Sequence, residues 1–223
     1  MPTADKPRRG DDSRRDLKET AIDCFARYGY QGTSIDRIAR EAGVTKGAIY
    51  YHFKDKNDLL SAAVADRVAE FEARVQKACE GTTPSESLLG VVRVCVEHAT
   101  SEDRPRFAIK LMVEAIDTHD RLLEDMRGMM RRFRAFLRNI VRAGQDSGEF
   151  RADANADIAA ALLTSAVIGA ETQYYLDPER FNLGHALESY VARLCNDLRP
   201  VREGRGSTST QPPEQPTQGR TQP

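Results

Sequence analysis

The sequence predicts an all-α fold, and three observations lead to that prediction. Apolar residues recur three or four positions apart through most of the chain, which is the spacing of one helix face. No run of alternating apolar and polar residues is long enough for a strand, and no internal repeat is visible. Glycine and proline residues separate the helical patterns, as expected for helices joined by short loops.

The composition is that of an ordinary globular protein. Of 223 residues, 40% are hydrophobic and 30% are charged, which is enough apolar material for one or two buried cores. The formal net charge of −1 does not decide for or against nucleic acid, because a local basic surface can lie within a neutral total. The most apolar stretch, residues 159–170, is shorter than the roughly 20 residues of a membrane-spanning helix. With no signal peptide visible at the polar start, we expect a cytoplasmic protein without a membrane partner.

The first part of the chain reads as three short helices. Residues 1–12 are polar and are expected to be a disordered arm. The first helix carries Leu17, Ala21 and Phe25 on one face and closes at two glycines, Gly29 and Gly32. The second helix is capped by Thr33 or Ser34 and is broken at Gly43, and the third begins at Thr45 and runs to about Phe53.

The rest of the chain reads as longer helices. Asp55 begins a fourth helix that we expect to reach residue 79, and residues 81–84 form a linker. Helical patterns then follow at about 85–100, 105–116, 120–145, 154–175 and 184–198. Residues 200–223 are rich in Pro, Gly, Gln, Thr and Ser and are expected to form a disordered tail.

The segment from Thr33 to Leu60, TSIDRIAREAGVTKGAIYYHFKDKNDLL, contains two short helices joined by a tight turn at residues 42–44. Gly43 permits the positive φ that such a turn needs. Apolar side chains can form a small shared core: Ile35, Ile38, Ala39, Val44, Ile49 and Phe53. The remaining side chains of the third helix offer hydroxyl, ammonium and aromatic groups, which suit the major groove and its phosphates. Residues 33–56 hold five Lys or Arg against three Asp or Glu, a local excess of the right sign.

Taken together, the pattern AxxxF…YGYxGTSIxxIAxxAGVTKGAIYYHFKDKxDLL resembles the DNA-binding domain of tetracycline-repressor (TetR) family regulators. The resemblance covers about residues 14–62, and beyond it only the number and length of the helices are similar. It implies a homodimeric repressor that binds double-stranded operator DNA and is released by a small-molecule inducer. The expected division is then a helix-turn-helix DNA-binding domain at 13–54 and a helical ligand-binding and dimerisation domain at 55–199, with 55–79 as its linker helix.

The resemblance also assigns DNA contacts residue by residue. Phosphate contacts are expected at the start of the second helix, from Tyr50 and His52, and from Lys56; Lys46 is expected to reach bases or phosphate. Thr45 and Tyr51 are expected to touch bases. The full set is Thr33, Ser34, Arg37, Thr45, Lys46, Gly47, Ala48, Tyr50, Tyr51, His52 and Lys56.

Basic residues near the start of the chain leave two interpretations open. Arg8, Arg9, Arg14, Arg15 and Lys18 could form an arm that enters the minor groove. Four aspartates dilute this charge, so a solubilising tail is the preferred interpretation.

Polar groups among apolar helices predict a ligand pocket between the helices of residues 85–175. The residues proposed for it are His98, Phe107, Met112, Glu114, Met129, Phe133, Leu163 and Gln173. Each of them also fits a simpler role at a helix surface or in the core. The arginines between Arg127 and Arg142 leave a similar choice between a solvated face and an anchor for an anionic ligand.

The last two long helices predict the dimer interface, as a four-helix bundle formed with their symmetry mates. The first of them contributes a face of small and apolar residues: Ile158, Ala161, Leu162, Ser165, Ala166 and Gly169. The second contributes an apolar stripe: Leu187, Tyr190, Val191, Leu194 and Leu198.

The alternatives to an inducible repressor are an activator or ligand-independent regulator, and an all-α carrier or enzyme. No nucleophile elbow, HExxH, P-loop or Gly-rich dinucleotide motif is present, so we expect no catalytic residue and no cofactor. His52 has no Asp, Cys or His partner at useful spacing. The four cysteines lie far apart without a CxxC pair, so we expect free thiols and no metal.

Overall fold

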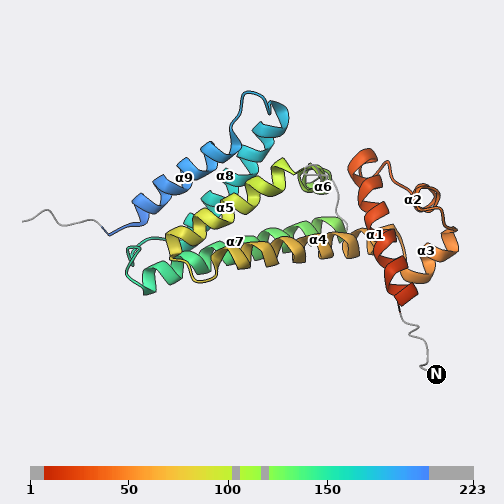
Figure 1. Cartoon of the computed structure of the whole chain (residues 1–223), viewed down its shortest axis with the longest axis horizontal. Helices are drawn as coiled ribbons and strands as arrows, with labels where there is room; N and C mark the ends of the chain where they lie inside the picture. Colours follow the sequence, from red (N-terminus) through yellow and green to blue (C-terminus); the bar gives the residue numbers. More distant parts are fainter. Residues whose placement is uncertain (1–7, 102–105, 117–120, 201–223) are drawn as a thin grey trace, which may run out of the picture.

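The computed structural model describes residues 8–101, 106–116 and 121–200. Within these ranges the chain is a succession of α-helices without a strand, which confirms the all-α prediction (Figure 1). The helices are α1 (Arg8–Tyr28), α2 (Ile35–Glu41), α3 (Lys46–His52), α4 (Lys56–Cys79), α5 (Pro84–Thr100), α6 (Phe107–Ile116), α7 (Arg121–Asp146), α8 (Ala156–Leu176) and α9 (Leu183–Leu198).

Side-chain caps start the helices that surround the helix-turn-helix, as the sequence predicts. Ser34 accepts a hydrogen bond from the backbone N–H of the third residue after it, and Thr45 and Asp55 do the same at α3 and α4. These bonds satisfy N–H groups that have no partner inside a helix. The cap of α5 is a complete capping box between Thr83 and Glu86, followed by proline at its first position.

The beginning of α1 differs from the prediction. Residues 8–12, expected to be part of a disordered arm, form its first turn. The buried residues Leu17, Ala21 and Phe25 hold the middle of this helix in place. Once a helix has formed, each residue added at its N-terminal end gains a backbone hydrogen bond, which offsets the loss of backbone entropy. Residues 1–7 of the expected arm, and all but Pro200 of the expected tail, lie outside the described residues.

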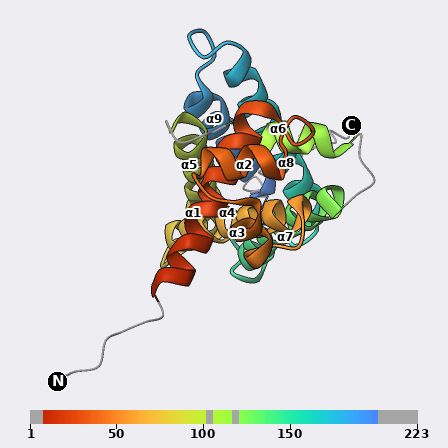
Figure 2. The same ribbon diagram turned by 90° about the vertical axis from the view of Figure 1, so that its right-hand side faces the viewer.

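The helices form a head and a body. α1, α2 and α3 form the head at one end of the molecule, and Figure 2 looks directly onto it. α4 and α7 run side by side along the length of the molecule, and α5, α8 and α9 pack with them to complete the body (Figure 1). α6 is short and lies where the body meets the head, in contact with both α1 and α7.

Two buried clusters divide the molecule differently from the expected domain boundary at residues 54 and 55. The head core joins α1, α2 and α3 to Leu59, Leu60, Ala63 and Val64 of α4, and also to buried residues of α6 and the start of α7. The body core joins the far end of α4 to α5, α8, α9 and the rest of α7. The physical division therefore runs across α4 and α7, because each of these long helices buries one end in each cluster.

The most apolar stretch of the sequence lies in α8, which buries one face against α7 and α9. No helix within the described ranges is both long and apolar enough to cross a membrane. The four cysteines all belong to the described part and are free thiols. Burial raises the pKa of the Cys95 thiol, which makes it a poor nucleophile.

Candidate nucleic-acid interface

Buried apolar residues fix the angle between α2 and α3. Ile38 and Ile49 are fully buried and Phe53 nearly so, which holds the two short helices against α1. The turn between them uses Gly43 at φ +67°, in the region that favours glycine. Val44, expected in this small core, instead has an exposed side chain. Its backbone N–H donates a hydrogen bond to the carbonyl oxygen of Ala39, which holds the turn in a conformation with the Val44 side chain at the surface.

The outward face of α3 is unusually rich in exposed aromatic side chains. The side chains of Tyr51 and Tyr50 are 85% and 54% exposed. Tyr51 and Gly47 lie on the side of α3 opposite the buried Ile49, as the helical angle of 100° per residue requires. Two large aromatic side chains left in solvent on a rigid short helix form a surface suited to a partner rather than to the core.

Lys46 extends along the same exposed edge. Its ammonium pairs with the carboxylate of Asp36 on α2, and both side chains are more than half exposed. An exposed pair of this kind contributes little to stability, so the ammonium can exchange Asp36 for another anion. Ser34 and Thr45 remain exposed while their hydroxyls cap α2 and α3, and Ala48 is half-buried beside them.

Two residues expected to contact DNA have partners within the chain. Thr33 is buried, and its hydroxyl donates to the carbonyl oxygens of Cys24 (3.1 Å) and Gly29 (2.7 Å) at the end of α1. The Lys56 ammonium donates to the Tyr30 carbonyl oxygen (2.9 Å) and lies 3.9 Å from the centre of the Tyr30 ring. Both side chains therefore tie the loop after α1 to its neighbours, and Thr33 is not available to DNA.

The remaining head residues have mixed surroundings. The Arg37 guanidinium lies over the ring of Tyr28, 4.0 Å from its centre, in a cation–π contact. His52 is half-buried and packs edge-on against Tyr51.

Among the described residues no group of three or more His, Cys, Asp and Glu is arranged to hold a metal. In the first helix, Lys18 pairs with Asp66 of α4 and is therefore turned away from any DNA arm.

The eight residues proposed for a ligand pocket do not come together. Phe107 and Met129 belong to the head core, whereas Leu163 and Phe133 belong to the body core. His98 packs edge-on against Phe71, and Gln173 is exposed with its amide bonded to a carbonyl of its own helix. One of the eight, Met112, lines a groove between α6 and α7. Helical spacing could not separate these positions, because pocket walls and core share the same period.

Glu114, the last of the eight, connects the body to the head. Its carboxylate accepts a hydrogen bond from the backbone N–H of Tyr30 (2.6 Å). One turn earlier on α6, the Lys110 ammonium donates to the Ala26 carbonyl oxygen at the end of α1 (2.7 Å). Gly29 adopts φ +74° directly beside this carboxylate. The three residues form a latch between α6 and the end of α1, and Lys110 is not among the site residues predicted from the sequence.

The residues of the expected dimer face are mostly exposed on α8 but mostly buried on α9. Ile158 and Leu162 of α8 are 56% and 52% exposed, and Ala161, Ser165 and Gly169 are exposed beside them. In α9, however, Leu187, Val191 and Leu198 are buried within the chain's own body core. Those three pack inward because α9 has a single apolar face and the core of its own chain occupies it.

Comparison with known proteins matches two consecutive parts of the chain to two family models. The family model "Bacterial regulatory proteins, tetR family" matches residues 17–63, and the model "BetI-type transcriptional repressor, C-terminal" matches residues 84–196. The HTH-type transcriptional regulator AcrR of Shigella flexneri is 26% identical over 200 residues, which cover 84% of this chain and 93% of AcrR. The fatty acid metabolism regulator protein of Bacillus subtilis (strain 168) is 21% identical over 180 residues, covering 81% and 92%.

Solved structures share the fold. SmeT, the repressor of the Stenotrophomonas maltophilia multidrug efflux pump SmeDEF, superposes with a TM-score of 0.71 at 23% identity, covering 90% of this chain and 97% of SmeT. FadR from Bacillus subtilis, solved in complex with stearoyl-CoA, gives a TM-score of 0.70 at 22% identity, covering 81% and 96%.

An exposed helix-turn-helix on a larger helical body defines a DNA-binding transcriptional regulator. Two family models together span both parts of the chain, and the C-terminal one alone covers half of it. The chain belongs to the tetR family of bacterial regulatory proteins.

Proposed function

We propose that this protein is a homodimeric repressor that leaves a pseudo-palindromic operator when a small hydrophobic or drug-like molecule binds its C-terminal part. The observation that carries the proposal is the solvent-exposed face of α3, with Tyr51 and Tyr50 opposite the buried Ile49. Relatives support the inducer: FadR of Bacillus subtilis was solved with stearoyl-CoA, and SmeT represses a multidrug efflux pump.

In this proposal α3 enters the major groove. Gly47 and Tyr51 face the base edges, because they lie farthest from the buried side of the helix, and the half-buried Ala48 lies beside them. Thr45 lies at the helix start beside them. Phosphates on either side are contacted by Lys46, by Tyr50 and His52, and by Ser34 and Arg37 of α2. Phosphate contacts set the position of the helix, and base contacts set the sequence that it reads.

Two copies are needed to read two half-sites. The exposed apolar side chains of α8, Ile158 and Leu162, stand among small residues that permit close helix approach, and Tyr190 and Leu194 of α9 are only half-buried. A two-fold axis through this surface brings the same residues of both copies together. The spacing of the two heads then depends on how each head sits on its body.

The head sits on the body through α4 and through the latch on α6. Inducer binding that favours another position of α6 changes the Glu114 and Lys110 contacts to α1 and so turns the head. Linkage requires that operator DNA weaken inducer binding by the same factor.

Alanine substitutions on the exposed face test the DNA-binding assignment. Lys46→Ala is expected to weaken operator binding by about 1–3 kcal/mol, and Tyr50→Ala to weaken binding to all sequences because a phosphate contact is lost. Gel-shift titrations at several salt concentrations measure both, with a shallower salt dependence for Lys46→Ala.

The matched control is Lys77→Ala, in the last turn of α4 at the far end from the head. It should bind the operator like the unaltered protein. Unchanged affinity in both Lys46→Ala and Tyr50→Ala would remove α3 from the interface. Lys56 is a poor probe, because its ammonium also holds the loop at Tyr30.

The latch has its own test in Glu114→Gln. Glutamine keeps an acceptor for the Tyr30 N–H but loses the charge, so the folded protein should lose about 1 kcal/mol of stability. Equilibrium urea denaturation measures the loss. Glu80→Gln, at the exposed C-cap of α4, makes the same chemical change outside the latch and should leave the midpoint in place. Identical curves for the two variants would show that the latch contributes nothing.

A further inference from the structure

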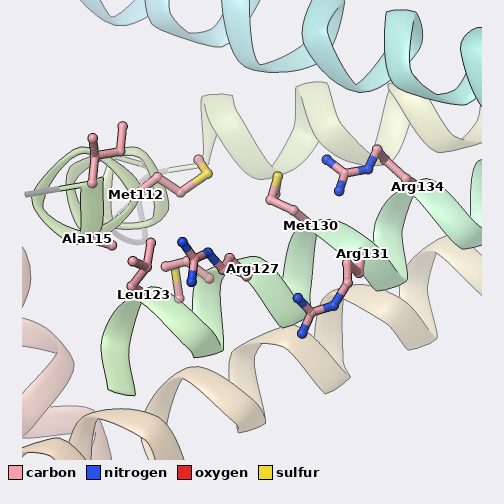
Figure 3. Close-up of a pocket in the computed structure, with 9 residues that line it drawn as sticks. Met112, Ala115, Leu123, Arg127, Met130, Arg131 and Arg134 are labelled. Carbon is pink, nitrogen blue, oxygen red and sulfur yellow. The ribbon is translucent and has the colours of Figure 1, made fainter. Parts of the chain in front are cut away.

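An open groove of about 410 Å³ lies between α6 and the first half of α7. Its volume is within the range of small-molecule sites. Figure 3 shows the groove from the side, with α6 seen end-on and Arg127 of α7 close to it; the side chains of Arg131 and Arg134 extend to opposite sides of α7 in this view. It is lined by Met112, Ala115, Ile116, Leu123, Met126, Arg127, Met130, Arg131 and Arg134.

The lining has two chemical halves. One is apolar and dominated by three methionines, whose flexible, polarisable side chains adapt to ligands of varied shape. The other is a row of three guanidinium groups: Arg127, Arg131 and Arg134 follow one another at i, i+4 and i+7 and so share one face of α7, over a length of about 10 Å. Among the described residues that line the groove there is no carboxylate.

The arginines of α7 differ in their ion pairs. Arg127 pairs with Glu124 on its own helix. Arg131 and Arg134 form no ion pair with any residue of the described chain, whereas Arg132 and Arg138 of the same helix pair with Glu72 and Asp157. Arg132 and Arg138 therefore hold neighbouring helices and Arg127 is paired within α7, whereas Arg131 and Arg134 leave their positive charge at the rim of an apolar groove.

We propose that this groove binds an anionic alkyl amphiphile, with its chain on the methionines and its carboxylate or phosphate head on Arg131 and Arg134. Guanidinium groups bind such heads through paired N–H donors, and a neutral or cationic head gains nothing from them. The proposal names the inducer class and rests on the proposed function as a ligand-responsive repressor.

The position of the groove explains how its occupant reaches DNA. Met112 and Ile116 line the groove from one side of α6, while Lys110 and Glu114 hold α1 from the opposite side. A chain inserted between α6 and α7 displaces α6, and the latch on the end of α1 moves with it. One short helix thus carries both the ligand wall and the contact to the head.

Four probes with the same chain length separate the head-group chemistry: dodecanoate, dodecyl phosphate, dodecanol and dodecyltrimethylammonium, each below its micellar concentration. Calorimetry on the full chain should show the two anions binding at least about tenfold more tightly than the alcohol, and the cation not binding. Dodecanoate and dodecyl phosphate together show whether a carboxylate suffices or a phosphate is preferred.

The variant is the double substitution Arg131→Gln with Arg134→Gln, and the control is Arg142→Gln, an exposed arginine of α7 outside the groove. The double variant should lose about tenfold or more in affinity for the anions and keep its weak binding of dodecanol, while the control stays within about twofold. Its thermal unfolding should match that of the unaltered protein, because neither Arg131 nor Arg134 forms an ion pair with a neighbouring helix among the described residues.

Operator release is measured separately by gel shift with each probe. Equal binding of the anions by the double variant, or tighter binding of the cation, overturns the proposed site. A protein that binds the anions but no operator overturns the repressor assignment alone and leaves the groove established by calorimetry. A protein that binds its operator but none of the probes overturns the groove and leaves a DNA-binding regulator.

Discussion

Replacing Leu162 with arginine is expected to break the dimer and to lower operator affinity by about 100-fold or more. Leu162 is half exposed on α8, among small residues that let a second copy approach closely. A two-fold interface through this surface buries Leu162 of both copies, so the substitution adds two like charges to one desolvated surface. A single head then binds only a half-site and loses the gain from linked binding.

Sedimentation velocity and gel-shift titration test the two halves of this expectation. Leu162→Arg should sediment as a monomer at concentrations where the unaltered protein is a dimer. Gln76→Arg, on an exposed part of α4, adds the same charge away from α8 and should change neither property. A Leu162→Arg protein that stays dimeric would place the interface elsewhere.

Replacing Glu171 with glutamine is expected to stabilise the protein above neutral pH. Glu171 lies on α8 close to Cys95 and Tyr175, and burial raises the pKa of its carboxyl from 4.5 to about 7. The ionised form is therefore disfavoured in the folded state. Below pH 4.5 the carboxyl is protonated in both states and contributes no difference.

As pH rises from 4.5 to 7, the unfolded chain ionises first, so the folded protein loses stability by about 3 kcal/mol in total. Glutamine has no such titration. Denaturation at pH 4.5 should thus give similar stabilities for the two proteins, and at pH 8 the variant should be more stable by about that amount. Glu179→Gln, an exposed residue after α8, is the control. A stability difference that does not change with pH would contradict the expectation.

The helices could be predicted from the sequence because their ends are set locally. Ser34, Thr45 and Asp55 each cap a helix through a bond to a residue three positions away. The start of α1 was not predictable in this way, because residues 8–12 continue an existing helix and carry no cap. The outward face of α3 could also be predicted from the sequence, because the apolar residues Ile49 and Phe53 indicate which side of the helix is buried.

The site was less predictable where a side chain has a distant partner. Glu114 bonds to Tyr30, which lies 84 positions away, and Lys56 bonds to the same loop across 26 positions. Thr33 looks like a surface cap by its type, yet the end of α1 uses its hydroxyl. In each case the residue type indicated a polar contact, and tertiary packing decided what the partner was.

The head core has a consequence for recombination between regulators. Because this core includes Leu59 and Leu60 of α4, together with α6 and Leu122 of α7, the DNA-reading head is not a contiguous cassette of the gene. A chimera joined at residue 55 would pair one regulator's α1 to α3 with another's α6, and the Glu114 and Gly29 surfaces would have to match by chance. New operator specificity is therefore more accessible through point substitutions on the exposed face of α3 than through exchange of whole heads.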